Sequence, residues 1–158
     1  LDDLQHEVWR IRTEYFQNQA KQYPNQAQAK IQLGWCLTGT KNWYEAIKQF
    51  EKIEAEHCAF TIVEEIALQL GLAESQQAIR RFDDALGTFT KLLELLTQCK
   101  QPDEVDEELS AQFPGLENES GMQRSLKRIK TLAASMNQTA LCQKCDDLAQ
   151  KIVVSTDN

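Results

Sequence analysis

Apolar residues recur along most of this chain at intervals of three and four, the spacing that gathers them on one face of an α-helix. The first stripe consists of Leu4, Val8, Ile11, Tyr15 and Ala20. It ends near Tyr23-Pro24, because proline disfavours helical geometry in the residue before it. Further helices are predicted over residues 25–38 and 42–56, after 61, and over 82–96, 126–136 and 141–152. Since no strand-like alternation persists, the pattern predicts an all-α fold of about seven helices in antiparallel hairpins.

The helix after residue 60 has a clear start signal. Thr61-Ile62-Val63-Glu64 has the spacing of a capping box, in which the threonine oxygen and the glutamate carboxylate satisfy backbone amides reciprocally. The spacing predicts that this helix buries Ile62, Ile66, Leu70 and Ala73. The next helix is expected to have a wide apolar face that starts at Phe82.

The helical periodicity lapses between residues 99 and 120. This stretch holds two of the three prolines and the acidic run of residues 103–108. It is interpreted as a long exposed acidic connection, with the option of a short helix around 103–110. Residues 121–153 then form either a degenerate hairpin or a terminal cap of a single domain spanning 1–158.

Small and aromatic residues recur at matched positions in two segments. Leu33-Gly34 is followed by Ala46 and Phe50, and Leu70-Gly71 by Ala85 and Phe89. In both copies the alanine precedes the aromatic residue by four positions, one helical turn. Small side chains at a helix crossing allow two backbones to approach closely, so each segment predicts a tightly packed helical hairpin.

These two segments resemble the tetratricopeptide repeat (TPR), a stacked helix-turn-helix unit, over residues 27–97. The spacing from Gly71 to Ala85 is two residues longer than that from Gly34 to Ala46, and the closing proline of the family is absent in both copies. An irregular helical bundle therefore remains an alternative. The resemblance implies a groove for a partner peptide or helix, lined by Gln28, Ile31, Trp35, Thr38, Glu65, Leu68 and Leu72, with Ser75 beside them.

Composition and charge limit the classes of partner. The 158 residues include 24 acidic and 17 basic side chains, a net charge of -7, which disfavours nucleic-acid binding. No apolar run is long enough to cross a bilayer, so no membrane association is expected within this chain. Five cysteines form an odd set, which favours reduced thiols and a cytoplasmic location. Because the chain starts at Leu1, we expect it to be a piece of a longer protein.

Two clusters deserve a chemical interpretation. Cys142 and Cys145 have the spacing of half a zinc site, which His57-Cys58 could complete, but Cys145 also falls on an apolar stripe. Core packing is the preferred interpretation, and no metal or cofactor is predicted. The basic cluster Arg124, Lys127, Arg128 and Lys130 fits either an acidic partner surface or a phosphate group, or else ion pairs with the acidic run and plain solvation, with the latter preferred.

No arrangement of residues points to catalysis. The two histidines lack a nucleophile context, and the six glycines are scattered rather than forming a phosphate-binding loop. The sequence therefore predicts a non-catalytic scaffold that binds another protein, with Trp35 as an anchor in the groove. Two alternatives remain: a self-association segment that forms a homo-oligomer, and a regulatory segment of a multidomain enzyme.

Overall fold

The computed structural model describes residues 3–56, 59–99, 102–112 and 122–156. Within those ranges the chain forms eight α-helices and no β-strand, which confirms the predicted all-α fold. The helix beyond the seven predicted lies in the segment interpreted as an acidic connection. In chain order the helices are α1 (Asp3–Gln22), α2 (Gln28–Gly39), α3 (Trp43–Glu56), α4 (Ile62–Ala78), α5 (Phe82–Gln98), α6 (Pro102–Gln112), α7 (Met122–Ser135) and α8 (Thr139–Thr156).

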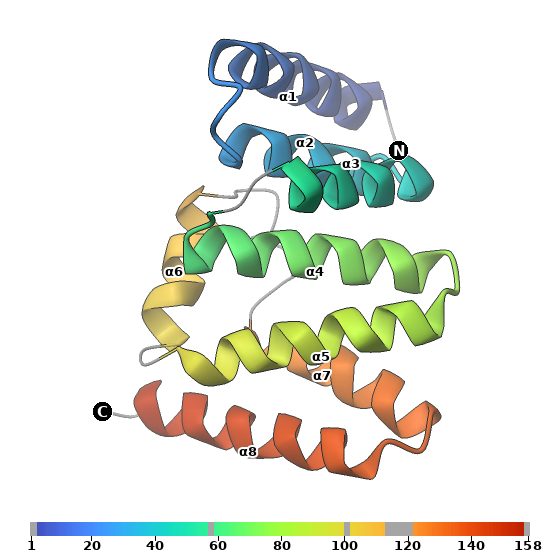
Figure 1. Ribbon diagram of the computed structural model, residues 1–158, viewed down its shortest axis with the longest axis vertical. Helices are drawn as coiled ribbons and strands as arrows, with labels where there is room; N and C mark the ends of the chain where they lie inside the picture. Colours follow the sequence, from blue (N-terminus) through green and yellow to red (C-terminus); the bar gives the residue numbers. More distant parts are fainter. Residues whose placement is uncertain (1–2, 57–58, 100–101, 113–121, 157–158) are drawn as a thin grey trace.

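The helices form a stack of antiparallel hairpins. Figure 1 shows α1 at one end and α8 at the other, with α2 to α5 between them and α7 behind α5. Three hairpins, α2–α3, α4–α5 and α7–α8, pack side by side, and α1 covers α2. The short helix α6 runs across the stack and contacts α4 and α8. The fold is therefore a helical-repeat fold in which a crossing helix separates the second and third hairpins.

The same turn closes all three hairpins. A residue with positive φ stands two positions before the second helix of each: Lys41 (64°), Arg80 (65°) and Asn137 (58°). In each case the next amide donates to the carbonyl five residues back, as Asn42 does to Leu37 at 2.8 Å. This pair of features is the Schellman motif, which satisfies carbonyl groups at a helix C-terminus. Residues 122–156 are thus a hairpin with the turn geometry of the other two.

The repeated glycines pack against one aromatic ring. A Cβ added to Gly34 would lie 2.4 Å from the ring of Phe50, and one added to Gly71 would lie 2.5 Å from it. Phe50 is completely buried. The ring therefore lies between α2 and α4, and the absence of both Cβ atoms lets the two helices approach it.

The start of α4 confirms the predicted capping box. The backbone amide of Glu64 donates to Thr61 Oγ1 at 3.1 Å, and the Thr61 amide donates to Glu64 Oε1 at 2.9 Å. Two apolar residues near helix starts were assigned to buried faces incorrectly: Ile62 is 39% exposed and Phe82 is 41% exposed. Each is the first residue of its helix, and within the described residues neither is fully covered. Ile66, Leu70 and Ala73 are buried as predicted.

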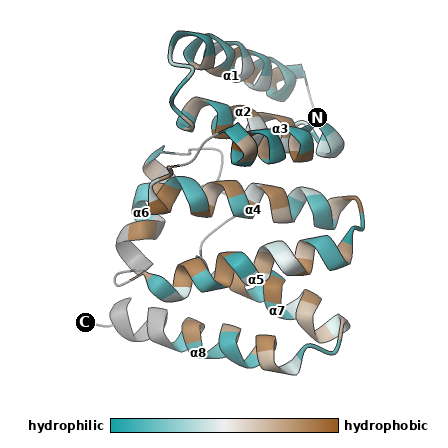
Figure 2. Cartoon of the chain, viewed as in Figure 1, coloured by the Kyte–Doolittle hydropathy of each residue, from teal (hydrophilic) through white to brown (hydrophobic). Residues whose placement is uncertain are grey.

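Most of α4 is buried, because helices surround it. Its neighbours are α2, α3, α5 and α6, and Figure 2 shows hydrophobic residues along α4 and α5.

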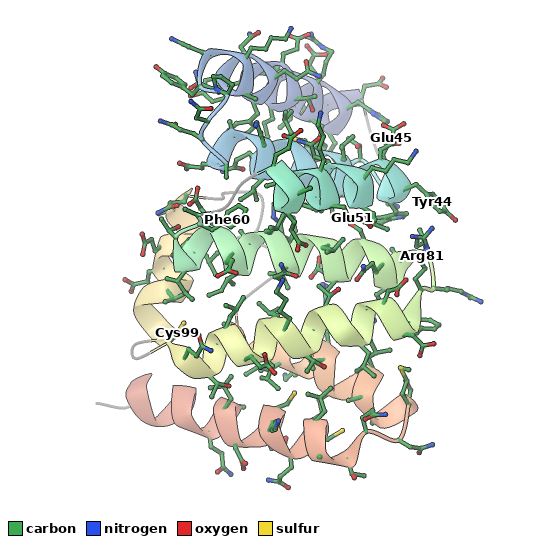
Figure 3. All side chains as sticks on the ribbon, viewed as in Figure 1. Tyr44, Glu45, Glu51, Phe60, Arg81 and Cys99 are labelled. Atoms are coloured by element: carbon green, nitrogen blue, oxygen red, sulfur yellow. The ribbon has the colours of Figure 1, made fainter. Side chains whose placement is uncertain are left out.

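Lys91 of α5 pairs with Glu54 of α3 at 3.6 Å, and the Arg81 guanidinium lies 5.8 Å from the Tyr44 ring. Figure 3 shows Tyr44 and Arg81 close together on one side of the stack, midway between α1 and α8. These contacts join the outer helices of consecutive hairpins.

The segment interpreted as a long exposed connection is only partly exposed. Its described part consists of Cys99 and the helix α6, in agreement with the option of a short helix there. Leu109 is 3% exposed and belongs to the main apolar cluster, and Val105 packs against that cluster. Glu107 and Glu108 are exposed. The spacing of four residues between Val105 and Leu109 gives this short helix one apolar edge, which the acidic run obscured in the sequence.

Candidate interaction surfaces

The seven residues predicted to line a groove differ sharply in burial. Gln28 is exposed and Glu65 is half-buried. The other five are at most 7% exposed: Ile31, Trp35, Thr38, Leu68 and Leu72. In this conformation those five side chains pack within the chain, and of the seven only Gln28 and Glu65 are substantially accessible to solvent.

Trp35 connects three helices. Its ring is 5% exposed and meets the Phe50 ring of α3 edge-on, with centroids 6.4 Å apart. Its indole Nε1 donates to the Ala67 carbonyl of α4 at 3.1 Å. A buried indole N–H needs such an acceptor, so this hydrogen bond fixes the side chain in the contact between the first and second hairpins.

A second polar contact joins the same two helices. Thr38 Oγ1 lies 3.4 Å from Ser75 Oγ, and each hydroxyl also donates to a carbonyl one turn back in its own helix. Those carbonyls belong to Gly34 and Gly71, at 3.1 Å and 2.9 Å. The two hydroxyls thus occupy matching places, four residues after the repeated glycines. They place a second polar contact in the interface, beside the hydrogen bond from Trp35 to Ala67.

Helix α6 lies against α4 and α8, and its C-terminal residue reaches α2. Its Leu109 is 3% exposed and belongs to the main apolar cluster. At the C-terminus of α6 the side-chain amide of Gln32, itself 5% exposed, donates to the carbonyl of Gln112. A helix C-terminus has carbonyl groups without partners in the helix, and Gln32 satisfies one of them. The layer formed by α2 and α4 therefore already contacts one short amphipathic helix.

Two of the three described side chains of the basic cluster form ion pairs. Arg128 of α7 pairs with Glu74 of α4, whose side chain is 8% exposed. Lys130 pairs with Asp146 of α8 at 2.7 Å, and Lys127 is exposed. The side chain of Arg124 lies outside the described residues. The preferred interpretation named ion pairing, and among the described side chains the pairs of Arg128 and Lys130 are with Glu74 of α4 and Asp146 of α8.

The cysteine pair is divided between core and surface. Cys145 is 2% exposed, and burial, with smaller contributions from Cys142 and Asp146, raises the pKa of its thiol to about 11. Cys142 is half-buried, and its Sγ lies 3.7 Å from the Lys130 carbonyl. Among the described side chains no group of three or more His, Cys, Asp or Glu is arranged to hold a metal ion. His57-Cys58, the proposed second half of a zinc site, lies outside the described residues.

Two hollows lie on the surface between neighbouring helices. One, of about 430 Å³, is bordered by α1, α2 and α3 and lined by Lys21, Lys30 and Lys52 around Leu33 and Ile53. Lys30 and Lys52 lie 3.6 and 3.8 Å from Glu56, which reduces the positive charge there. The other, of about 460 Å³, lies between α5 and α8. Both are open depressions on the surface rather than enclosed cavities.

The most exposed apolar side chains gather on α1. Of the eight large hydrophobic residues with high exposure in the described part of the chain, four are Leu4, Val8, Ile11 and Tyr15. They are the first four members of the apolar stripe recognised in the sequence. The opposite face of α1 packs on α2: Trp9 lies against Gly39, where an added Cβ would be 2.3 Å from the indole ring. The stripe was visible in the sequence, but its spacing could not show that it faces solvent.

The fold and these surfaces define an all-α helical-repeat protein. Its three hairpins share one turn geometry, and the first two pack through an aromatic ring held between two glycines. No helix in the described residues has both the length and the apolarity required to cross a membrane. No protein-family model matches the sequence. A search of curated proteins also gives no match.

Proposed function

We propose that this chain is a non-catalytic protein-interaction scaffold of the TPR-like helical-repeat kind, which holds an amphipathic helix of a partner protein against the α2–α4 layer. The observation that carries this proposal is the seating of α6. This helix places Leu109 in the apolar cluster and keeps Glu107 and Glu108 in solvent. Binding of an amphipathic helix by its apolar edge is a recurring mode of peptide recognition.

The proposed binding face provides both apolar and polar contacts. The apolar cluster receives Leu109, and Gln32 donates to the carbonyl at the end of α6. A partner helix would replace α6 and make the same two kinds of contact. Gln28 and Glu65, the accessible members of the predicted groove, are proposed to contribute at its border.

The buried members of the predicted groove have a supporting role in this proposal. Trp35 and Thr38 connect α2 to α4 through Ala67 and Ser75. They would hold the two helices at the separation that the partner requires, rather than contact the partner directly.

The cytoplasmic location expected for the scaffold is in keeping with the four described cysteines, all of which are free thiols.

A labelled peptide with the sequence of residues 102–112 tests the proposal. Leu109→Glu should release α6, because a charged side chain cannot remain in the apolar cluster. Fluorescence anisotropy should then show peptide binding to the Leu109→Glu variant and much weaker binding to the wild type, where α6 competes. An isolated helix of this length is only marginally formed in water, so the titration must extend to high peptide concentration.

Ala111→Glu is the matched control, since it adds the same charge to an exposed position of α6. It should bind the peptide no better than the wild type. Circular dichroism and thermal unfolding must show that the Leu109→Glu variant retains its other helices. If that variant is folded and does not bind the peptide, the α2–α4 layer is not a helix-binding face and the proposal is wrong.

A further inference from the structure

Helix α1 has two faces with different surroundings. One face packs on α2 through Trp9. The other carries an apolar stripe, here called the α1 seam, in solvent. The exposed fractions of its members are 73% for Leu4, 41% for Val8, 54% for Ile11 and 56% for Tyr15. Large apolar residues grouped on one surface usually mark an interaction site, whereas isolated ones need no explanation.

The spacing of the α1 seam indicates what kind of surface would cover it. Its members follow one another at intervals of four, three and four residues, which is the a/d pattern of a heptad repeat. Val8 and Tyr15 take the a positions, and Leu4 and Ile11 take the d positions. A seam of this kind packs against another α-helix, because side chains at a and d fit between those of a facing helix.

Charged residues border the seam on both sides. In the same heptad, Glu7 takes a g position and Arg12 takes an e position. Glu7 forms an ion pair with Arg10, which also pairs with Glu14 at 2.7 Å, and the Arg12 guanidinium lies 5.2 Å from the Trp9 ring. An acidic border on one side and a basic border on the other restrict the helices that can pack here.

We propose that the α1 seam pairs with the α1 seam of a second copy of this chain, with the two helices parallel and in register. In parallel pairs the g residue of one helix lies beside the following e residue of the other. Glu7 of each copy then lies beside Arg12 of the other, which gives two opposite-charge contacts. An antiparallel pair would instead place Glu7 of one copy near Glu14 of the other.

The seam thus complements itself in both shape and charge. Each apolar residue meets its own counterpart across the two-fold axis, as expected for an interface between identical surfaces. Because α2 packs on the opposite face of α1, the two stacks extend away from the pair in opposite directions. This inference does not depend on the proposed helix-binding face, which involves α2, α4 and α6.

Sedimentation velocity over a range from low micromolar to millimolar protein tests the pairing. The wild type should shift from monomer towards dimer as its concentration rises. Ile11→Glu should raise the dissociation constant by about 100-fold or more, since each dimer loses two apolar contacts and gains two neighbouring charges. Ile62→Glu is the matched control: it changes an exposed isoleucine on α4, and the dimer should persist. Leu4→Glu, at a still more exposed position, provides a second variant in case Ile11→Glu perturbs the fold.

The orientation is tested by charge and by cross-linking. Glu7→Arg should weaken the dimer by placing two cations side by side, and adding Arg12→Glu should restore it. Val8→Cys should oxidise to a cross-linked dimer beyond the level of the wild type, because parallel pairing brings the two copies of position 8 together. Three results would overturn the inference: a monomer at every concentration, a dimer that Ile11→Glu leaves intact, or a dimer that neither cross-links at position 8 nor recovers in the charge exchange.

Discussion

The ring of Phe50 lies against the backbone of Gly71, a residue of the following hairpin. A Cβ on Gly71 would be 2.5 Å from Phe50 Cζ, and the same ring excludes a Cβ on Gly34 of its own hairpin. One aromatic side chain therefore explains both repeated glycines. Gly71, in the second copy of the motif, packs against Phe50 of the first copy. The motif therefore reflects packing between hairpins as well as within them.

We expect Gly71→Ala to lower the free energy of unfolding by about 1–3 kcal/mol, because the added methyl group overpacks the contact with Phe50. Gly87→Ala is the matched control, since a Cβ there meets nothing within 4 Å. That change should stabilise α5 by up to about 1 kcal/mol, the helix preference of alanine over glycine. Urea unfolding measures both changes. Equal effects of the two substitutions would contradict the close contact at Phe50.

The contact between Phe50 and Gly71 combines one feature that the sequence predicts with another that it does not. The intervals between glycine, alanine and aromatic residues predicted tight hairpins, since they depend only on local helical geometry. Which glycine meets which ring depends on how one hairpin is rotated against the next, and no local pattern contains that rotation. For the same reason Trp35 was predicted to face a groove, whereas its indole bonds Ala67 of the neighbouring hairpin.

Burial at the edges of the fold was harder to predict for a different reason. Leu109 lies among acidic residues, so its contribution to the core was hidden by the composition of the segment. The α1 seam shows the reverse case: an apolar stripe indicates that a helix has one apolar face, but not that a neighbour covers it. Whether a face is covered depends on the arrangement of the whole stack, and among the described helices α1 packs mainly against α2.

The shared hairpin turn leads to a second prediction. Lys41 and Arg80 adopt positive φ, where a side chain is unfavourable and glycine is preferred. Lys41→Gly and Arg80→Gly should each raise the free energy of unfolding by about 0.5–1 kcal/mol. Lys48→Gly, at an exposed position inside α3, should instead lower it by about 1 kcal/mol. If all three substitutions destabilise the protein in thermal unfolding, the positive-φ turns are not present in solution.

The third prediction concerns the ion pair that connects the second and third hairpins. Arg128→Met should lower the free energy of unfolding by about 1.5–3 kcal/mol, because Glu74 is nearly buried and loses a charged hydrogen-bond donor. Lys130→Met removes an exposed pair with Asp146 and should lower the free energy of unfolding much less. In the Glu74→Gln background, Arg128→Met should cost less than it does alone. Additive effects in that double-mutant cycle would show that the two side chains do not interact.

The fourth prediction is a pH dependence that originates at Cys145. Burial raises the pKa of its thiol from 9.0 to about 11 in the folded protein. Between those two values the unfolded chain releases the thiol proton while the folded chain keeps it. The unfolded state then binds fewer protons, so stability falls as the pH rises through this window, and below it the thiol contributes no pH dependence.

Comparison with Cys145→Ala isolates this contribution, because every other titrating group is common to the two proteins. At neutral pH the variant should be less stable by a constant amount that reflects lost packing. As the pH rises from about 9 to about 11, the wild type should lose stability faster than the variant, and the two unfolding free energies should converge. Cys142→Ala, which changes the half-buried neighbour, should not remove the decline. Urea unfolding curves that stay parallel for the wild type and Cys145→Ala across this range would show that the Cys145 thiol is not buried in the folded protein.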